Sequence, residues 1–326
     1  MGGGRYVGRL APSPTGALHL GNVRTFMVAW LRARQAGGRL ILRTEDLDHP
    51  KHKAGAAAQA IGDLRWLGFD WDEEHVQSGR VPLYAEALEK LRSKGLAYPC
   101  VCSRRDVEAA QSAPHEGDQL HYPGTCRGRF ASWDDALAHL NPAPQDASPL
   151  RLPCWRFRLP CWRFRVPEGS VVSFDDVFAG GYSMDVGARL GDFPLARDGK
   201  GAGYTLAVVV DDAAMGVTEV VRGDDLLPAT PQQILVYRAL GLEPPDFFHV
   251  PLVVGADGRR LAKRHGDTRI AAFRESGMPP EEIVGYLAWT LGILPERKPA
   301  SLESLVPDFR PNRIPREPLV FGNPFP

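Results

Sequence analysis

The sequence predicts an α/β fold built around a parallel sheet. Short segments rich in Val, Ile and Leu alternate with segments in which apolar residues recur at helical spacing, near the start of the chain and again after residue 203. The chain has 326 residues, 44% of them hydrophobic, which suffices for one large domain or two modest ones. Because loops at the carboxyl ends of parallel strands form the ligand crevice, we expect the functional residues there.

The first half of the predicted sheet lies in the N-terminal part of the chain. Residues 5–11 predict a short strand that ends in the turn PSPTG, and a helix follows over about 21–35. Residues 39–46 indicate a buried strand that ends in charged residues. Apolar residues at helical spacing predict two more helices, over about 54–67 and 81–94. This order implies parallel strands joined by crossover helices.

From about residue 99 to 190 the pattern changes, which indicates a smaller insertion. Cysteines appear, followed by polar and Pro-rich stretches such as NPAPQDASP. The heptapeptide LPCWRFR occurs at 152–158 and again, unchanged, at 159–165. Because seven is odd, a strand carrying both copies would present opposite faces in each. We expect one copy to form the strand and the other a bulge or loop.

The alternation of helices and strands resumes in the second half of the chain. It runs through YTLAVVVDD (204–212), GVTEVVRG (216–223), a helix near 230–240 and the strand HVPLVVG (249–255). The last sixty or so residues contain one clear helix, about 279–291, and a Pro-rich, extended end.

Charge and composition limit the classes of function. The formal net charge is zero, so an RNA partner would have to meet a local basic face. We find no secretory signal and no apolar run near the length of a membrane span, so we expect a cytoplasmic protein without a membrane partner. Five cysteines without an export signal favour metal ligands or buried thiols over disulfides.

The first motif runs from Arg9 to Gly16 and continues through His19 to Asn22. Gly16 and Gly21 permit tight turns and close approach of the backbone to a ligand. The helix that starts near Gly21 directs its N-terminal N–H groups at the crevice, which suits a phosphate. His19 can donate a hydrogen bond to phosphate oxygens during substitution at phosphorus. The alternative is a Pro-rich turn with a His that only caps the helix.

The ordered series RLAPSPTGALHLGN, RTxxxxWLxAR and GGRLILRTEDLD resembles glutamyl-tRNA synthetases, a branch of the class I aminoacyl-tRNA synthetases. Gln77-Ser78-x-Arg80, VVVDD and GVTEVVRG extend the resemblance over about 1–270. Asn22 replaces the second of the family's paired histidines, as in many glutamyl enzymes.

The resemblance implies a Rossmann-like class I synthetase catalytic domain with a parallel sheet. We assign its two nucleotide-binding halves to 1–98 and 191–265, the second half carrying the signature loop. The inserted subdomain then covers 99–190, and a short helical C-terminal support region covers 266–326.

Five residues at predicted strand ends or adjoining turns suggest an amino-acid pocket: Arg9, Ser13, Glu45, Tyr204 and Arg222. A glutamate side chain needs a cation, and its ammonium group needs a carboxylate such as Glu45. The resemblance implies that Arg9 and Arg222 bracket the substrate carboxylates, that Tyr204 adds a hydroxyl, and that Ala11 and Ser13 complete the site. Each residue alone could instead form a surface ion pair.

A second motif, Arg260-Leu-Ala-Lys263-Arg-His-Gly, resembles the Lys-Met-Ser-Lys-Ser signature of class I enzymes. We assign Lys263 and His19 the catalytic role of stabilising charge on the α-phosphate and the leaving pyrophosphate. The implied ATP contacts are Pro14, His19, Gly21, Asn22 and Lys263, with Mg²⁺ bound to ATP. Ala262 and Arg260 depart from this consensus. In the amino-acid pocket, Val208 stands where many glutamyl-tRNA synthetases have Asn, which removes a polar contact and predicts a variant pocket. The alternative is an ordinary basic surface loop.

Cys100-Val-Cys102 and Tyr122-Pro-Gly-Thr-Cys126 suggest a zinc site, since zinc takes four N, S or O ligands. Spacing alone nominates His121 or His115 as the fourth ligand. The pattern resembles the zinc site of glutamyl-Q-tRNA(Asp) synthetases, which implies that Tyr122 completes the set and the insertion bears zinc. We expect the duplicated Cys154 and Cys161 not to be ligands. Reduced, unliganded cysteines are the alternative.

Length, cysteine pattern and AVVVDD together resemble glutamyl-Q-tRNA(Asp) synthetases, because only about sixty residues follow the signature loop. That family transfers activated glutamate to queuosine in the anticodon of tRNA(Asp). The implied partners are ATP, L-glutamate and the tRNA(Asp) anticodon loop, bound by a monomer. Arg residues of 151–165 and Trp155 or Trp162 are candidates for RNA contact, with core packing as the alternative for the Trp. The competing functions are a truncated glutamyl-tRNA synthetase that charges tRNA(Glu) and a non-catalytic RNA- or nucleotide-binding paralogue.

Overall fold

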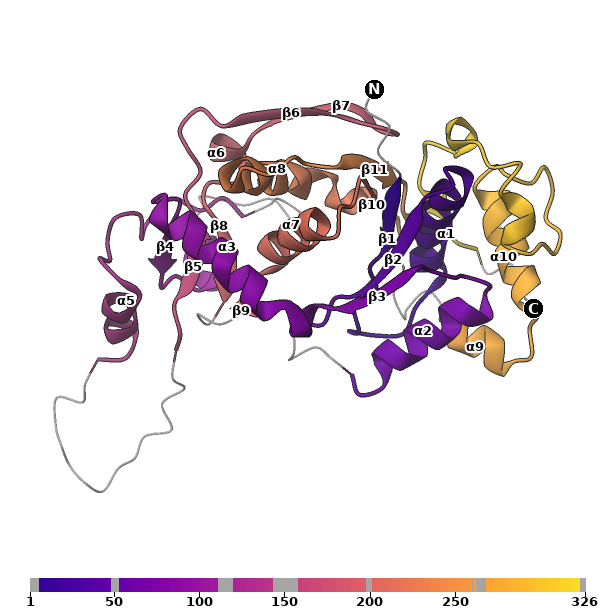
Figure 1. Cartoon of the computed structure of the whole chain (residues 1–326), viewed down its shortest axis with the longest axis horizontal. Helices are drawn as coiled ribbons and strands as arrows, with labels where there is room; N and C mark the ends of the chain where they lie inside the picture. Colours follow the sequence, from indigo (N-terminus) through magenta and orange to yellow (C-terminus); the bar gives the residue numbers. More distant parts are fainter. Residues whose placement is uncertain are drawn as a thin grey trace, which may run out of the picture.

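The computed structural model describes residues 6–47, 53–110, 120–142, 158–197, 201–259, 261 and 268–322. Its centre is a set of five parallel strands (Figure 1): β1 (Val7–Leu10), β2 (Arg39–Thr44), β3 (Glu73–Val76), β10 (Glu219–Gly223) and β11 (Asp246–Val250). β1, β2 and β3 form one ladder, and β10 and β11 form another. The two ladders meet where the N–H of Thr218 donates to the carbonyl of Val7 at 2.9 Å. The spatial order is therefore β3-β2-β1-β10-β11. The chain adds β2 and β3 on one side of β1, and β10 and β11 on its other side.

Helices cover both faces of this sheet. One face packs against α1 (Leu20–Gln35), α2 (Ala56–Trp66), α9 (Ile270–Glu275) and α10 (Pro280–Thr290). The other face packs against α3 (Val81–Ser93), α7 (Tyr204–Ala214) and α8 (Thr230–Leu240). Neighbouring strand residues divide between the two cores, as Leu40 and Ile41 do in β2, because successive side chains of a strand point to opposite faces. This double burial explains why the strands are almost continuously apolar.

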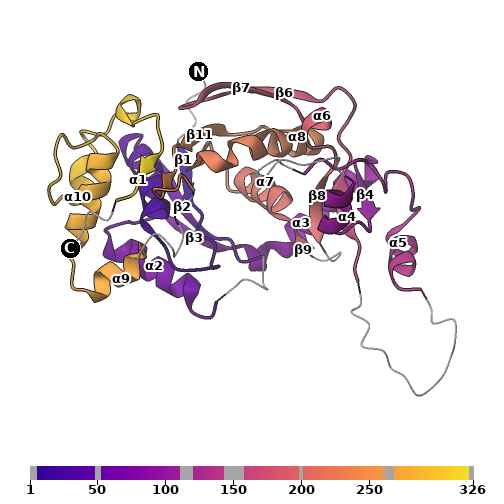
Figure 2. The ribbon, with the colours of Figure 1, turned by 180° about the vertical axis from the view of Figure 1, so that it is seen from behind.

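The insertion contributes a second, antiparallel sheet with the order β4-β5-β8-β9. Its strands are β4 (Ala97–Cys100), β5 (Cys161–Phe164), β8 (Phe193–Arg197) and β9 (Gly201–Ala202). The hairpin of β6 (Val171–Asp176) and β7 (Gly180–Asp185) extends from it, and three short helices accompany it: α4 (Arg104–Ala109), α5 (Trp133–Leu140) and α6 (Val186–Arg189). Figure 2 shows α5 and β4 at one end of the molecule and α9 and α10 at the other.

Short elements complete the fold around the sheet. They are the 3-10 turns η2 (Gln77–Arg80), η3 (Asp224–Ala229), η5 (Glu303–Leu305) and η6 (Pro311–Arg313), and the strands β12 (Val253–Val254) and β13 (Leu319–Val320). β13 pairs in parallel with β12, so the C-terminal segment returns to the strand that follows β11. Among the described residues, no helix is long and apolar enough to cross a membrane.

The predicted elements occur with two differences. Tyr204 does not lie at a strand end or turn, because 204–214 forms helix α7 despite its run of valines; burial of this helix between α3, α8 and the sheet overrides the β preference of valine. The predicted strand 249–255 is interrupted at Pro251, which separates β11 from β12.

The second copy of the duplicated heptapeptide forms β5, with a register shift between Trp162 and Arg163. The first copy lies outside the described residues apart from Arg158. Trp162 is only 6% exposed and stacks on Trp133 at 5.2 Å between ring centroids, which supports core packing of this side chain.

Candidate active site and metal site

A cavity of about 580 Å³ opens beyond the carboxyl ends of β1 and β10. This is the point where the strand order reverses, the usual ligand position in an open α/β sheet. Nine of the predicted site residues line the cavity: Arg9, Ala11, Ser13, His19, Gly21, Asn22, Glu45, Tyr204 and Arg222. Segments more than two hundred positions apart in the chain therefore meet in one cavity.

His19 lies at the N-terminus of α1 and faces this cavity. The backbone N–H of Asn22 donates to His19 Nδ1 at 3.4 Å, and the N–H of His19 donates to Asn22 Oδ1 at 3.2 Å. With Nδ1 as an acceptor, the neutral ring carries its proton on Nε2 and can donate from there. Capping of the helix and donation to a phosphate are thus compatible roles. A Cβ at Gly21 would lie 3.1 Å from this ring, so glycine leaves room for it.

Two cations and two carboxylates form a network at the inner end of the cavity: Arg9 and Glu45 line it, and Arg43 and Asp212 pair with them from behind. Glu45 accepts a hydrogen bond from Arg43 Nη2 at 3.1 Å, and Arg43 Nη1 also donates to Asp212 Oδ1 at 2.6 Å. Arg9 donates to the carbonyl of Val221 at 2.7 Å, and its Nε lies 3.9 Å from Asp212. Burial raises the pKa of Glu45, whereas Arg43 and Arg9 favour its charged form. A ligand that carries both an ammonium and a carboxylate can pair with members of each kind.

Arg222 is 5% exposed and is held by three hydrogen bonds. Nε donates to His249 Nε2 at 3.0 Å, Nη1 to Gln233 Oε1 at 2.8 Å, and Nη2 to Thr230 Oγ1 at 2.7 Å. A guanidinium has five N–H donors, so these bonds leave one donor on each terminal nitrogen. The geometry suits a fork that binds a carboxylate through its outer edge.

Tyr204 begins helix α7 and is 43% exposed at the cavity. Val208, one helical turn further, is buried and is not among the residues that line the cavity. The predicted change of the pocket at this position is therefore not a direct one.

Pro14 and the signature loop differ from the other predicted ATP contacts. Pro14 is buried, does not line the cavity, and uses its carbonyl to accept from the N–H of Lys53 at 3.2 Å. Lys263 lies outside the described residues, as do Arg260 and Ala262. The segments that flank this loop do reach the site: Val253 lines the cavity, and the carbonyl of Thr268 accepts from the N–H of Leu20 at 3.1 Å.

Sequence reasoning missed two groups of residues. The first group lines the cavity: Pro12, Thr15, Ala17, Leu18, Thr25, Phe26, Val221, Gly223, Asp225, Leu226, Leu252 and Val253. The second group fixes the site from behind, as Asp211 does by accepting hydrogen bonds from Gln77, Arg80 and Tyr84 at 2.9, 2.6 and 2.8 Å. Asp211 and Asp212, adjacent carboxylates near the end of the apolar helix α7, were the signal in the sequence that could have indicated this second group. Buried charges need partners, so their presence there predicts a buried polar network.

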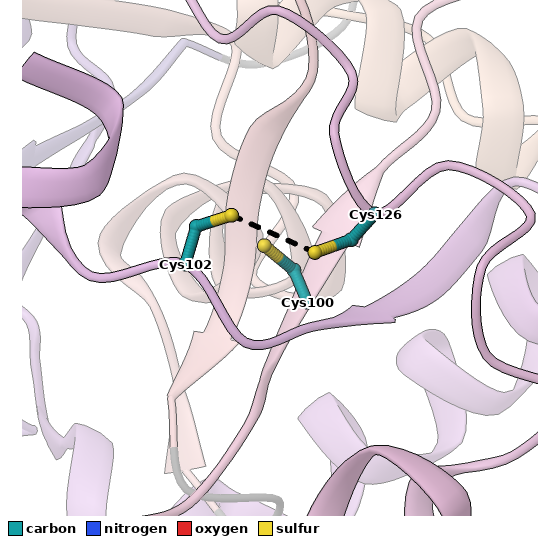
Figure 3. Close-up of side chains that lie close together, drawn as sticks. All are labelled: Cys100, Cys102 and Cys126. Atoms are coloured by element: carbon teal, nitrogen blue, oxygen red, sulfur yellow. Dashed lines mark hydrogen bonds between the residues drawn. The ribbon is translucent and has the colours of Figure 1, made fainter. Parts of the chain in front are cut away.

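The second cluster lies at β4 and the loops beside it (Figure 3). Cys100, Cys102 and Cys126 place their three sulfur atoms within 4.8 Å of one another, close enough to hold a metal ion. Cys102 Sγ lies 3.6 Å from Cys126 Sγ, and the Tyr122 hydroxyl lies 3.4 Å from Cys100 Sγ and 3.9 Å from Cys102 Sγ. Tetrahedral zinc bonded to sulfur and oxygen separates its ligand atoms by about 3.5 to 3.8 Å. The donor set and its spacing therefore fit zinc.

The charges around this cluster also favour a thiolate. Hydrogen bonds with Cys126 and Cys161, together with Arg163, lower the pKa of the Cys100 thiol. Burial and the neighbouring Cys100 raise the pKa of Tyr122, so its ionised form would need the charge of a bound metal. Cys161 lies opposite Cys100 in the β4–β5 ladder but outside the three-sulfur group. The His121 ring contacts the carbonyl of Gly187 at 3.2 Å, and His115 lies outside the described residues.

Comparison with known proteins agrees with the geometry of the site. The family model described as "tRNA synthetases class I (E and Q), catalytic domain" matches residues 6–304. Two relatives named glutamyl-Q tRNA(Asp) synthetase are 47% identical (Symbiobacterium thermophilum) and 49% identical (Rhodopirellula baltica); the matches cover 96% of this chain and 94% and 95% of those proteins.

A glutamate–tRNA ligase from Aquifex aeolicus is 39% identical over 96% of this chain and 63% of its own length. The crystal structure of a glutamate tRNA ligase from Elizabethkingia meningosepticum, in complex with its amino acid, superposes with a TM-score of 0.78 at 26% identity. It covers 98% of this chain and 67% of that one. The chain therefore belongs to the family of class I tRNA synthetase catalytic domains of the glutamate and glutamine branch.

Proposed function

We propose that this protein activates L-glutamate with ATP and transfers it to queuosine in the anticodon loop of tRNA(Asp). The observation that carries the activation step is the single cavity in which Arg9, Arg222 and Glu45 adjoin the N-terminus of α1 with His19. The choice of RNA rests on the relatives: those named for the queuosine reaction are 47% and 49% identical over nearly their whole length, against 39% for the Aquifex ligase.

Activation is a substitution at phosphorus. An oxygen of the glutamate α-carboxylate bonds to the α-phosphorus of ATP, the bond from that phosphorus to the bridging oxygen breaks, and pyrophosphate leaves. Nε2–H of His19 and the amino end of α1 stabilise the charge that develops on phosphate oxygens. The resemblance of the signature loop assigns the same task to Lys263. Mg²⁺ would enter with ATP and would neutralise further phosphate charge.

Substrate glutamate is held by charge complementarity within the cavity. Arg222 presents its two remaining N–H donors to one carboxylate, and Arg9 lies beside the other. Glu45 accepts from the ammonium group, and Tyr204 donates its hydroxyl at the cavity mouth. In the transfer step a hydroxyl oxygen of the queuosine cyclopentene ring attacks the activated carbonyl carbon, AMP leaves, and the hydroxyl proton passes to the AMP phosphate or to water.

We propose that Cys100, Cys102, Tyr122 and Cys126 bind one zinc ion. Its role would be structural, because four protein ligands close the coordination shell. It would fix the loops that follow β4 against the antiparallel sheet of the insertion. We also propose that the inserted subdomain, assigned to 99–190 from the sequence, continues to β9, because β8 and β9 belong to its antiparallel sheet. We retain a monomer as the acting form, which sedimentation of the zinc-loaded protein would test.

The decisive experiment measures incorporation of radiolabelled glutamate into three RNAs. These are queuosine-containing tRNA(Asp), the same tRNA(Asp) without queuosine as a matched control, and tRNA(Glu). Label on the first RNA alone supports the proposal, and label on tRNA(Glu) alone would refute the choice of RNA. Absence of glutamate-dependent ATP–pyrophosphate exchange by zinc-loaded protein would favour a non-catalytic RNA- or nucleotide-binding paralogue.

A further inference from the structure

A buried chain of polar residues lies directly behind Arg222. Asp176, at the end of β6, and His249, on β11, are both fully buried at their side chains and join at 2.6 Å between Oδ2 and Nδ1. His249 Nε2 in turn lies 3.0 Å from Arg222 Nε. This series of hydrogen bonds connects the β6–β7 hairpin to Arg222 in the cavity wall. Neither Asp176 nor His249 lines the cavity, so neither is a substrate contact.

The hydrogen bonds determine the tautomer of His249. Arg222 can only donate, so His249 Nε2 must be an acceptor without a proton. The ring proton therefore lies on Nδ1 and is donated to Asp176 Oδ2. Asp176 is held in place independently, because its Oδ1 accepts from the backbone N–H groups of Phe178, Ala179 and His249 at 3.0, 2.7 and 3.2 Å.

We infer that Asp176 and His249 are positioning residues for Arg222, and that tight glutamate binding requires the neutral His249 ring in the tautomer that Asp176 selects. The inference rests on the proposed function, in which Arg222 binds a glutamate carboxylate. Thr230 and Gln233 fix the terminal nitrogens of Arg222, and His249 fixes Nε, so the guanidinium plane is defined at three points. A proton on Nε2 of His249 would place that N–H against the Nε–H of Arg222. Two donors cannot bond to each other, so the contact that fixes Nε would be lost.

The charges around His249 favour its neutral form. Arg222 on β10 and Arg9 on β1 face it with positive charge, Asp176 faces it with negative charge, and Thr230 and Gln233 of α8 are uncharged. Burial lowers the pKa of His249 below its ordinary value of 6.5, and Arg222 and Arg9 add to that shift against the opposing Asp176. The neutral ring is therefore fully present above pH 6.5, and it is lost as the pH falls through the lower pKa of the folded protein.

The test uses Asp176→Asn, with Asp175→Asn as a matched control on the same strand, where the side chain is exposed. Asn at 176 can keep the backbone hydrogen bonds through its oxygen, but its amide nitrogen can only donate to Nδ1, which moves the ring proton to Nε2. In glutamate-dependent ATP–pyrophosphate exchange we expect the KM for glutamate to rise about tenfold or more, the scale of a lost hydrogen bond to a charged group. The KM for ATP should not change in either variant.

His249→Gln provides the rescue, because its side-chain oxygen can accept from Arg222 and has no proton to gain. We expect this variant to keep the KM for glutamate within about threefold of wild type, a small effect on the scale of one hydrogen bond. It should also lose the rise in that KM that we expect in wild type as the pH falls from 6.5 through the lower pKa of His249. In the His249→Gln background, Asp176→Asn should have little further effect.

Each outcome separates the inference from the function on which it rests. Wild-type protein without glutamate-dependent exchange would overturn the proposed function itself. Normal exchange with an unchanged KM for glutamate in Asp176→Asn would overturn only the positioning role. If Asp176→Asn does not fold, ¹⁵N NMR of the wild-type imidazole decides: an unprotonated Nε2 at neutral pH supports the inference, and a protonated Nε2 overturns it.

Discussion

Replacement of Tyr122 by Phe tests whether a phenol completes the metal site. The substitution removes one oxygen, which lies 2.8 Å from the N–H of Cys126 and 3.4 and 3.9 Å from the sulfurs of Cys100 and Cys102. The three remaining sulfurs stay close enough to share an ion, as in zinc sites that keep water as a fourth ligand. We therefore expect the variant to bind one zinc ion, but at least about tenfold more weakly than wild type.

The metal-free protein should also lose stability. The N–H of Cys126 is buried, and removal of its acceptor costs about 1–3 kcal/mol for an unpaired buried donor. Zinc content after competition with a graded chelator measures the first effect, and urea unfolding of metal-free protein measures the second. Tyr182→Phe, on the β6–β7 hairpin, is the matched control and should change neither.

A specific result would refute this reasoning. If Tyr122→Phe holds zinc as tightly as wild type, the phenol is not a ligand. Cys161 is then the residue to examine, because it lies opposite Cys100 in the β4–β5 ladder. We expect Cys161→Ser to leave zinc affinity unchanged; weaker binding by that variant would assign the fourth position to Cys161 and contradict the prediction from sequence.

Three further substitutions test the active site and its support. Glu45→Gln should raise the KM for glutamate about tenfold to a hundredfold in the exchange assay, since the ammonium group loses a charged acceptor. Lys263→Ala should lower the exchange rate at least about tenfold by removing one transition-state contact. Gly191→Ala should lower the free energy of unfolding by at least about 2 kcal/mol in urea titrations, because φ is +66° and the new Cβ would lie 2.3 Å from the carbonyl oxygen of Tyr122.

Matched controls accompany these three variants. Glu74→Gln removes an exposed carboxylate on β3, and Lys90→Ala removes an exposed ammonium group on α3. Gly79→Ala adds a Cβ that would have no heavy atom within 4 Å. If a variant and its control have equal effects, the cause is a change of surface charge or of backbone stiffness. Normal exchange by Lys263→Ala would contradict the role assigned to Lys263.

The pattern of apolar residues within a segment was sufficient to predict most strands and helices of the nucleotide-binding sheet and of the C-terminal region. The strands β1, β2 and β10 and the helices α1, α3 and α10 occur close to the predicted bounds because each pairs a clear periodicity with a terminal signal. The region from Tyr204 misled because valines favour strands locally, whereas its position between two helices and the sheet fixes it as a helix. The first motif predicts the turn around Pro14 but not which residues of that turn line the cavity, and Pro14 does not.

The supports of the site could not be predicted in the same way. Asp176 and His249 are 73 positions apart, and neither belongs to a motif that the sequence distinguishes. Their proposed roles follow only from the packing of the β6–β7 hairpin next to β11, which brings a carboxylate to the Nδ1 edge of the imidazole ring. Residues that touch a substrate recur in recognisable turns, whereas residues that orient them depend on tertiary contacts between distant segments.

The position of the C-terminal segment also depends on tertiary contacts that the sequence does not reveal. This segment packs beside the strand that precedes the signature loop. β13 pairs with β12: the N–H of Leu319 donates to Leu252 at 2.9 Å, and the N–H of Phe321 donates to Val254 at 2.7 Å. From the other side, buried Arg24 of α1 donates to the carbonyls of Pro251 and Thr290 at 2.8 and 3.3 Å. The strand that precedes the loop is thus tied to α1, to α10 and to the end of the described chain. The role proposed for Lys263 requires a signature loop with a fixed base, and the pairing of β13 with β12 fixes the strand that precedes this loop.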